Sequence, residues 1–141
     1  MQNLHLKIIT PKRIVLEKDI ASITVPSSEG DLTVLPHHTH LFSLLNEGIV
    51  TYRTEKNEEV LAIGGGYLET DGKNVQLLVT RAYGQDEIDH KATVKAIEDA
   101  KTDMKQVKDK KQLQDISTLL RRSLVDLKLL KRKAPKTFHN E

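Results

Sequence analysis

Glycine is confined to one part of this chain of 141 residues. All seven glycines lie between Gly30 and Gly84, and the 57 residues that follow contain no glycine and one proline, Pro135. A segment rich in Gly, Pro, Val, Ile and Thr is typical of short strands joined by turns, whereas a long glycine-free tract of Ala, Leu, Lys, Asp and Gln favours helix. The sequence therefore predicts two unlike parts that meet near residues 84 and 85.

In the first part, apolar residues alternate with other residues at a period near two, which is the pattern of half-buried strands. Eight or nine strands are expected, at residues 4–8, 14–16, 20–25, 32–34, 41–45, 49–53, 59–63, 67–70 and 75–79. Asp71-Gly72 is typical of a hairpin turn between the last two. Short strands at this spacing, each with one apolar face, predict a sandwich or flattened barrel over residues 1–85.

The second part changes to a helical period. Ile97, Ala100, Met104 and Val107 indicate a first helix, in which Ala92, Ala96 and Ala100 form a ridge of small residues. Asp86 or Asp89 is expected to cap its start, and the charged cluster at 108–111 is expected to turn the chain.

A second helix is indicated by an apolar stripe of Leu113, Ile116, Leu120, Leu124, Leu127 and Leu130, widened by Leu119, Val125 and Leu129. Because short helices are marginal alone in water, the two should pack as an antiparallel hairpin over residues 86–141. The fold class is therefore α+β, an N-terminal antiparallel β-sandwich followed by a C-terminal two-helix hairpin. The stripe is wider than one hairpin needs, so its surplus requires a second surface, from the sandwich or from another protein.

Charge is divided as unevenly as glycine. Residues 1–86 carry 8 basic and 11 acidic side chains, net −3, whereas residues 87–141 carry 14 and 9, net +5. A basic tail indicates an anionic partner, and nucleic acid, lipid and an acidic protein surface all fit. The chain has no cysteine, no apolar run of membrane-spanning length and no signal-peptide pattern at its start, so we expect a soluble protein that works where it is made.

Few residues point to chemistry. His37, His38 and His40 lie within four residues and could hold a transition metal, but no Cys or clear carboxylate ligand accompanies them, so a polar loop is favoured. Gly64-Gly65-Gly66 has the composition of a phosphate-binding loop, yet a strand-like segment follows it instead of a helix, which favours a bend or bulge. The sequence predicts no catalytic residues, no metal and no cofactor.

The basic tail could contact nucleic acid through Arg121, Arg122 and Lys128. Its only aromatic residue is Phe138, so no stacking platform is interleaved with the charges. A solvated helix face and an acidic protein groove are the other interpretations. A free-standing β-sandwich module with a basic helical tail for nucleic acid is therefore the alternative function.

Five segments of the first part stand out: Thr10-Pro11, 23–32, 34–38, 65–69 and 75–82. Together they resemble the epsilon subunit family of F-type ATP synthase. The stretch 28–38 is the most specific, because it looks like the family's SEGxLGxLPxHAPL pattern, and Gly65-Gly66-Tyr67-Leu68-Glu69 is second. The resemblance covers the whole chain in the family's order and length.

The resemblance implies a rotor subunit of the central stalk that couples proton flow to ATP synthesis and has no active site of its own. It implies that residues 1–85 bind the gamma subunit and rest on the c ring. Matching positions put Glu29 and Asp31 near the c ring, and Pro36, His37, His38 and His40 near gamma. It also implies a peripheral membrane protein on the cytoplasmic side of the bacterial plasma membrane, with no nucleic-acid partner.

The same resemblance implies a regulatory role for residues 86–141. Docked on the sandwich, such a hairpin permits rotation, and extended along gamma into the alpha/beta hexamer it obstructs ATP hydrolysis. Arg121, Arg122 and Lys128 could then meet an acidic loop of a beta subunit.

The chain departs from the family at two places. Some bacterial members open the first helix with an ATP-binding Ile/Leu-Asp-x-x-Arg-Ala motif, but here Ile88-Asp89-His90-Lys91 is followed by Ala92 where the motif has arginine. Losing a charge-assisted partner weakens binding, so we expect weak or absent ATP sensing. Thr39-His40 replaces the usual Ala-Pro, which alters the detail of that loop's contact with gamma.

Overall fold

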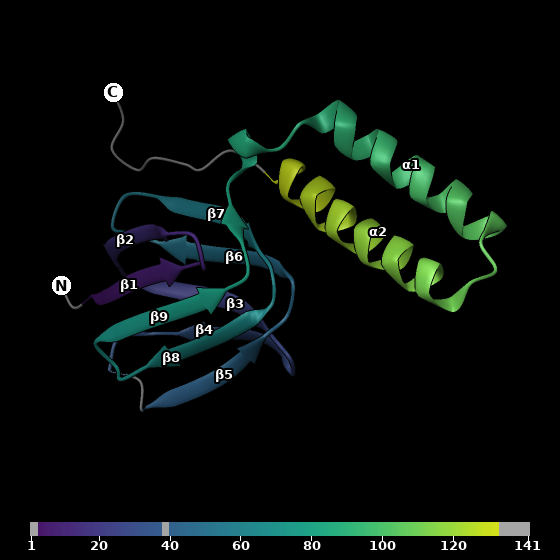
Figure 1. Ribbon diagram of the computed structural model, residues 1–141. Coiled ribbons are helices and arrows are strands. Elements are labelled where there is room, and N and C mark those ends of the chain that lie inside the picture. Colours follow the sequence, from purple (N-terminus) through teal and green to yellow (C-terminus); the bar gives the residue numbers. More distant parts are fainter. Residues whose placement is uncertain (1–2, 38–39, 133–141) are drawn as a thin grey trace, which may run out of the picture. The chain divides into compact units, whose positions relative to one another are not determined.

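The computed structural model describes residues 3–37 and 40–132. These residues form two compact units (Figure 1), one that ends at Gly84 and one that begins at Gln85. His38, one of the expected gamma contacts, lies outside the described residues.

Ten strands form the described part of the first unit: β1 Leu4–Ile9, β2 Ile14–Ile20, β3 Ser22–Ser27, β4 Gly30–Val34, β5 Leu41–Leu45, β6 Gly48–Arg53, β7 Glu58–Ile63, β8 Gly66–Thr70, β9 Asn74–Val79 and β10 Ala82–Tyr83. The expected fold class is confirmed. β10 was not expected, because two residues are too few to show a period. One pair, β1 with β9, is parallel, and the other pairs are antiparallel.

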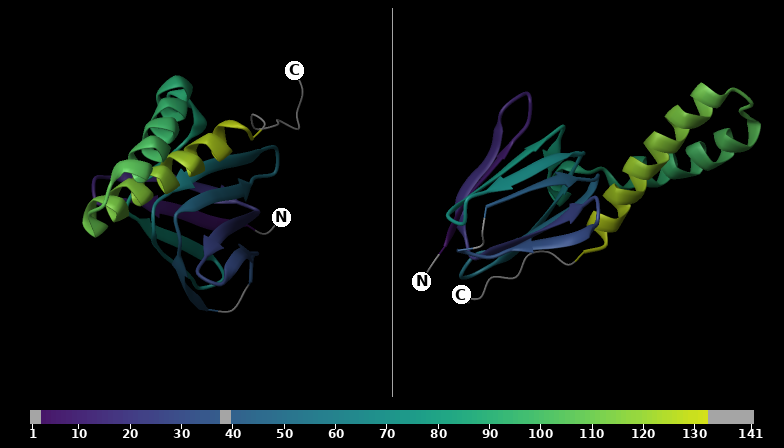
Figure 2. Two further views of the ribbon diagram at one scale, coloured as in Figure 1. Left: turned by 90° about the vertical axis from the view of Figure 1, so that its right-hand side faces the viewer. Right: turned by 90° about the horizontal axis from the view of Figure 1, so that it is seen from below.

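The strands form two layers that face each other across the core (Figures 1 and 2). One layer has the order β10-β7-β6-β3-β4 and the other β5-β8-β9-β1-β2, and the layers are joined where β3 meets β5. The core takes the inward residues of both layers, among them Leu6, Leu68 and Val50, which have no exposed surface. Alternating burial along β1 and β9 is the period-two pattern seen in the sequence.

β3 changes partner along one edge. It pairs with β6 at Ser22–Thr24 and with β5 at Ser27, and Pro26 lies just before the second pairing. Proline has no N–H to donate, so it suits a place where the ladder is interrupted. A Cβ on Gly48 would lie 3.0 Å from the Pro26 ring, so glycine gives this ring room.

The expectation that Ile20 shares a strand with Ile23 and Val25 was wrong. β2 ends at Ile20 and β3 begins at Ser22. Between them the chain bends at Ala21, whose N–H donates to the Arg53 carbonyl at 2.6 Å. Both segments keep their apolar side chains in the core, so a period count could not separate them.

The expected hairpin turn at Asp71-Gly72 is present. The Asp71 carboxylate accepts hydrogen bonds from the N–H groups of Lys73 at 2.9 Å and Asn74 at 2.7 Å, and Gly72 adopts a positive φ of 93°. The backbone hydrogen bonds lower the pKa of Asp71 to about 2, because they favour its charged form.

The second unit contains one turn of 3₁₀ helix, η1 Gln85–Glu87, and two helices, α1 His90–Gln106 and α2 Lys110–Leu130. The helices lie side by side and antiparallel (Figures 1 and 2). Asp89 caps α1 by accepting from Ala92 N at 3.0 Å, which selects one of the two expected caps. No helix in residues 3–37 and 40–132 has the length and apolar character that crossing a membrane requires.

Two details of α1 differ from expectation. Val107 lies beyond the helix with extended backbone angles. The buried residues of α1 are Thr93, Ile97 and Ala100, whereas Ala92 is exposed, so the expected ridge of alanines is wrong. Thr93, Ile97 and Ala100 lie four, eight and eleven positions past the cap Asp89, and this helical spacing sets the face that packs.

Candidate functional site

One row of apolar side chains crosses the outer face of the β5-β8-β9-β1 sheet. Leu44 lies opposite Tyr67, Tyr67 opposite Leu78, and Leu78 opposite Ile9. Cross-strand partners share a face, and the inward neighbours of these residues fill the core, so this row points away from the core. We call these four residues the outer row.

The outer row is accessible in the described chain. Leu44 is 59% exposed, and the other three side chains are half-buried. Phe42 lies two residues before Leu44 on the same face, is also 59% exposed, and its ring centroid is 5.1 Å from that of Tyr67. The next row on this face is polar, because Phe42 is followed across the sheet by Glu69, Gln76 and Lys7.

A groove of about 360 Å³ continues the outer row at one end of the sheet. It is lined by Ile9, Thr10, Pro11, Gly65, Gly66, Tyr67, Leu78, Val79 and Thr80. Three of the segments on which the family resemblance rests, Thr10-Pro11, Gly65-Gly66-Tyr67 and the end of 75–82, therefore meet in one place. Chain segments far apart in the sequence form this groove together, which marks it as a candidate binding surface.

The glycines beside this groove form a bend and not a phosphate site. The chain bends at Gly65, and β8 follows directly at Gly66, so there is no helix N-terminus here to bind an anion. A Cβ on Gly66 would overlap the Leu78 carbonyl oxygen and lie 2.8 Å from Val79 Cα. Gly66 is therefore required for β8 to lie against β9.

The expected c-ring contacts, Glu29 and Asp31, lie at the turn between β3 and β4 and are both exposed. Ser27 Oγ holds this turn by donating to the Gly30 carbonyl and accepting from Glu29 N at 3.2 Å. Gly30 has a φ of 116°, a conformation that other residues rarely adopt. The turn thus presents two carboxylates on a fixed backbone.

Of the expected gamma contacts, Pro36 is half-buried, and His37 and His40 are exposed. His37 has a positive φ of 67°, and its N–H donates to the Gly72 carbonyl at 2.9 Å, which ties this loop to the β8–β9 turn. No group of three His, Cys, Asp or Glu side chains in the described ranges could hold a metal ion.

The structure separates these two sets of residues. Glu29 and Asp31 lie at the start of β4, whereas Pro36 and His37 follow its end, and the five residues of β4 span ~17 Å. Two sets of residues at opposite ends of a strand can contact two different partners.

Arg121 and Arg122 belong to the second unit and are exposed on α2. Three leucines of the same helix are exposed as well: Leu113 at 38%, Leu119 at 51% and Leu124 at 45%. Leu113 and Leu124 are eleven residues, or about three turns, apart and therefore share one edge of the apolar stripe. The stripe thus extends beyond what α1 covers, as its width in the sequence indicates.

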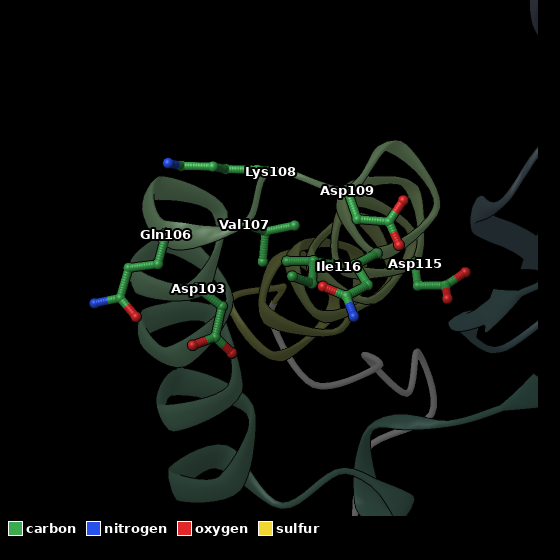
Figure 3. A pocket seen from close by; sticks show the side chains of 8 residues that line it. Asp103, Gln106, Val107, Lys108, Asp109, Asp115 and Ile116 are labelled. Atoms are coloured by element: carbon green, nitrogen blue, oxygen red, sulfur yellow. The ribbon is translucent and has the colours of Figure 1, made fainter.

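A hollow of about 620 Å³ lies at the tip of the hairpin (Figure 3), lined by Asp103, Gln106, Val107, Lys108, Asp109, Gln112, Asp115 and Ile116. The carboxylates of Asp103, Asp109 and Asp115 are separate from one another (Figure 3), and Asp109 caps α2 by accepting from Lys111 N at 3.2 Å. We assign this hollow to the helix–helix turn.

The sequence contains a signal for the outer row. Leu41–Leu45 and 77–79 have apolar residues on both faces of a strand, although only one face is needed for the core. A strand of a two-layer sandwich whose outer face is also apolar indicates a covered surface.

Comparison with known proteins finds relatives of this chain in one family. Residues 3–85 match the family model "ATP synthase, Delta/Epsilon chain, beta-sandwich domain". The ATP synthase epsilon chain of Moorella thermoacetica is 43% identical over 63% of this chain and 67% of the relative. The chloroplastic ATP synthase epsilon chain of Marchantia polymorpha is 32% identical over 83% of this chain and 86% of the relative.

Solved structures show the same fold. A chain of the Euglena gracilis mitochondrial ATP synthase structure, "OSCP/F1/c-ring in rotational state 1", matches with a TM-score of 0.71 and 23% identity, covering 93% of this chain and 79% of the other. A chain of the Tetrahymena thermophila mitochondrial ATP synthase "central stalk/cring" matches with a TM-score of 0.53 and 18% identity, covering 61% and 69%. The alternative of a free-standing nucleic-acid module receives no support from these matches. The chain belongs to the family of ATP synthase epsilon chains, as the resemblance in its sequence predicted.

Proposed function

We propose that this chain is a central-stalk subunit that joins the gamma subunit to the c ring and restrains ATP hydrolysis through its helical unit. The outer row carries this proposal. It is a partly exposed apolar strip on the outside of a rigid sandwich, and such a strip favours a permanent protein partner over solvent. The chain itself performs no catalysis in this role.

Gamma is the partner that we assign to the outer row and its groove. The groove is formed by the family-like segments, and Phe42, Leu44 and Tyr67 supply the aromatic and aliphatic area that anchors interfaces. Pro36, His37, His38 and His40 are proposed to extend this contact through the loop that precedes β5.

The c ring is proposed to contact the turn that bears Glu29 and Asp31. The turn is exposed and fixed by Ser27 and Gly30, and it lies at the end of β4 away from Pro36. Close packing makes the sandwich between this turn and the loop at Pro36 stiff, so torque can pass through it with little deformation. We propose that the chain is a peripheral component at the membrane surface, on the cytoplasmic side in a bacterium.

The helical unit is proposed to be the regulatory part. Leu113, Leu119 and Leu124 are apolar but exposed, and Arg121 and Arg122 lie beside them on α2. A helix of this kind can enter a groove in the alpha/beta hexamer and meet an acidic loop there. Ala92 stands where an ATP-binding arginine would be, so ATP control of the hairpin is not part of the proposal.

Co-purification with gamma tests the first part. Leu44→Arg should reduce recovery of the complex at least about tenfold, because it removes an apolar anchor and puts a charge into the interface. Gln76→Arg is the matched control, since Gln76 lies one row away on the same face. Equal loss of complex for both variants, or for neither, contradicts the assignment of the outer row to gamma.

Removal of residues 87–141 tests the regulatory part. Membrane ATPase activity should rise while the truncated chain still assembles, because the obstruction to hydrolysis is gone. Unchanged ATPase activity in an assembled complex contradicts the inhibitory role.

A further inference from the structure

The open end of the helical hairpin is held by one side chain. Gln85 Nε2 donates to the Leu129 carbonyl at 2.8 Å and to the Arg132 carbonyl at 2.9 Å. Gln85 is the first residue of the unit, and its acceptors belong to the last turn of α2 and the residues after it. One amide therefore joins the beginning of the helical unit to its end.

The segment around Gln85 is short and ordered by its own hydrogen bonds. The Gln85 carbonyl accepts from Ile88 N at 3.2 Å and closes η1, and α1 starts only two residues later under its Asp89 cap. The chain between Gln85 and the start of α1 is therefore short and ordered. A bond from Gln85 to α2 fixes the spacing between the two helices at this end.

The Leu129 carbonyl is one of the last carbonyls of α2, and Arg132 follows the end of the helix. The last carbonyls of a helix have no partner within the helix, and the dipole makes this end partially negative. At the end of α2, backbone N–H groups of Lys131 and Arg132 reach the Leu127 and Leu129 carbonyls at 3.1 and 3.0 Å. Gln85 adds a side-chain donor to this end, which is a C-terminal cap supplied from the other end of the unit.

The rest of the hairpin interface is modest. α1 buries Thr93, Ile97 and Ala100, and α2 buries Ser123 and Leu129, so two large apolar side chains share the buried part of the interface with two hydroxyls and one methyl group. The other end is joined by the short turn of 107–109. Separation of the helices must therefore begin at the end that Gln85 holds.

We propose that Gln85 is a clasp whose hydrogen bonds to the α2 C-terminus set the balance between a closed hairpin and one in which α1 and α2 separate. This deepens the proposed regulatory role and rests on it for its effect on ATP hydrolysis. The clasp acts through donors toward a partially negative helix end. Its strength therefore follows the charge and donor capacity of the side chain at position 85 and not its size.

The test uses three variants of the full chain that are similar in length but differ in chemistry. Gln85→Met removes the donors, and hydrogen exchange at the Lys131 and Arg132 amides should become about tenfold faster, as expected for two lost hydrogen bonds. Gln85→Glu adds repulsion from the helix end and should open the hairpin further. Gln85→Lys restores a donor and a favourable charge, so exchange should stay within about twofold of the parent.

Opening can be measured directly because the chain has no cysteine. Spin labels on Lys95→Cys and Lys128→Cys report the distance between exposed positions of α1 and α2. The fraction of molecules with a long distance between the two labels should be lowest with Lys at position 85, higher with Met and highest with Glu. Gln114→Met and Gln114→Glu, at an exposed glutamine within α2, are the controls and should leave the distribution unchanged.

Two results overturn the clasp. In the first, Gln85→Met and Gln85→Glu have the same hydrogen-exchange rates and spin-label distances as the parent. In the second, the hairpin of Gln85→Lys is as open as that of Gln85→Glu. The second result means that packing and not donation matters. The same variants in the assembled complex separate the two proposals. If opening follows the expected order while ATPase activity does not change, the clasp stands and the regulatory role fails.

Discussion

Lys18 Nζ lies 3.6 Å from a Glu59 carboxylate oxygen, and this ion pair connects β2 with β7 where no backbone ladder joins them. Lys18 also lies 5.5 Å from the centroid of the Tyr52 ring, and the Tyr52 hydroxyl donates to Glu59. Burial, with the Glu59 bond second, raises the pKa of Tyr52 above its usual value. Side chains thus close the sandwich at one edge, and an inward charge on an edge strand discourages pairing with another chain.

Lys18→Met should lower the free energy of unfolding by about 1 kcal/mol, because the partly buried Glu59 loses its cation and Tyr52 loses a cation–π contact. Urea unfolding measures this change in the free energy of unfolding. Lys7→Met is the control, since Lys7 is 4.0 Å from a more exposed Glu17, and a much smaller loss is expected there. A larger loss for Lys7→Met contradicts the closing role of Lys18.

His5 links β1 to β2 through both ring nitrogens, with Nδ1 2.9 Å from Asp19 and Nε2 2.8 Å from Glu17. The hydrogen bond to Asp19, followed by that to Glu17, raises the pKa of His5 above 6.5. This stabilisation is fully present below the unfolded pKa and is lost as the pH rises through the higher folded pKa. NMR titration of the His5 ring should show the raised pKa, and Asp19→Asn should lower it; a His5 pKa of 6.5 or less contradicts the pairing.

The sandwich should lose stability in acid as the Asp71 carboxylate becomes protonated. The pKa of Asp71 falls from 3.8 to about 2, so its contribution is present above the unfolded value and is lost as the pH falls toward the folded one. Urea unfolding between these pH values should show this loss in the parent and a smaller one in Asp71→Asn, which keeps an acceptor oxygen without the charge. Equal pH dependence in both proteins excludes the carboxylate as its source.

Gly66→Ala should destabilise the sandwich by at least about 3 kcal/mol, because the new methyl group meets the backbone of Leu78 and Val79, which cannot yield as a side chain can. Gly65→Ala is the matched control, since its Cβ would lie 3.5 Å from the Leu45 carbonyl oxygen, an ordinary contact. Thermal unfolding compares the two. Similar stability for both variants contradicts the close approach of β8 to β9.

Strand and helix positions followed from local rules. The side-chain direction repeats every second residue in a strand and about every 3.6 residues in a helix, so the outlines of β5 and α2 are visible in the apolar pattern. Turn chemistry is equally local, which is why Asp71-Gly72 could be read correctly. The same rules could not divide β2 from β3 at Ala21, because the hydrogen bond that bends the chain there comes from Arg53.

The sequence by itself determined the two-part organisation, the fold class and the family, since these depend on composition, period and motif. Tertiary structure alone decided that Leu44, Tyr67, Leu78 and Ile9 form one row, because cross-strand register depends on how four separate strands pack. It also decided that Gln85 reaches the end of α2, since 44 residues separate Gln85 from Leu129. Contacts between distant segments depend on the global packing of the chain, and no local pattern carries that information.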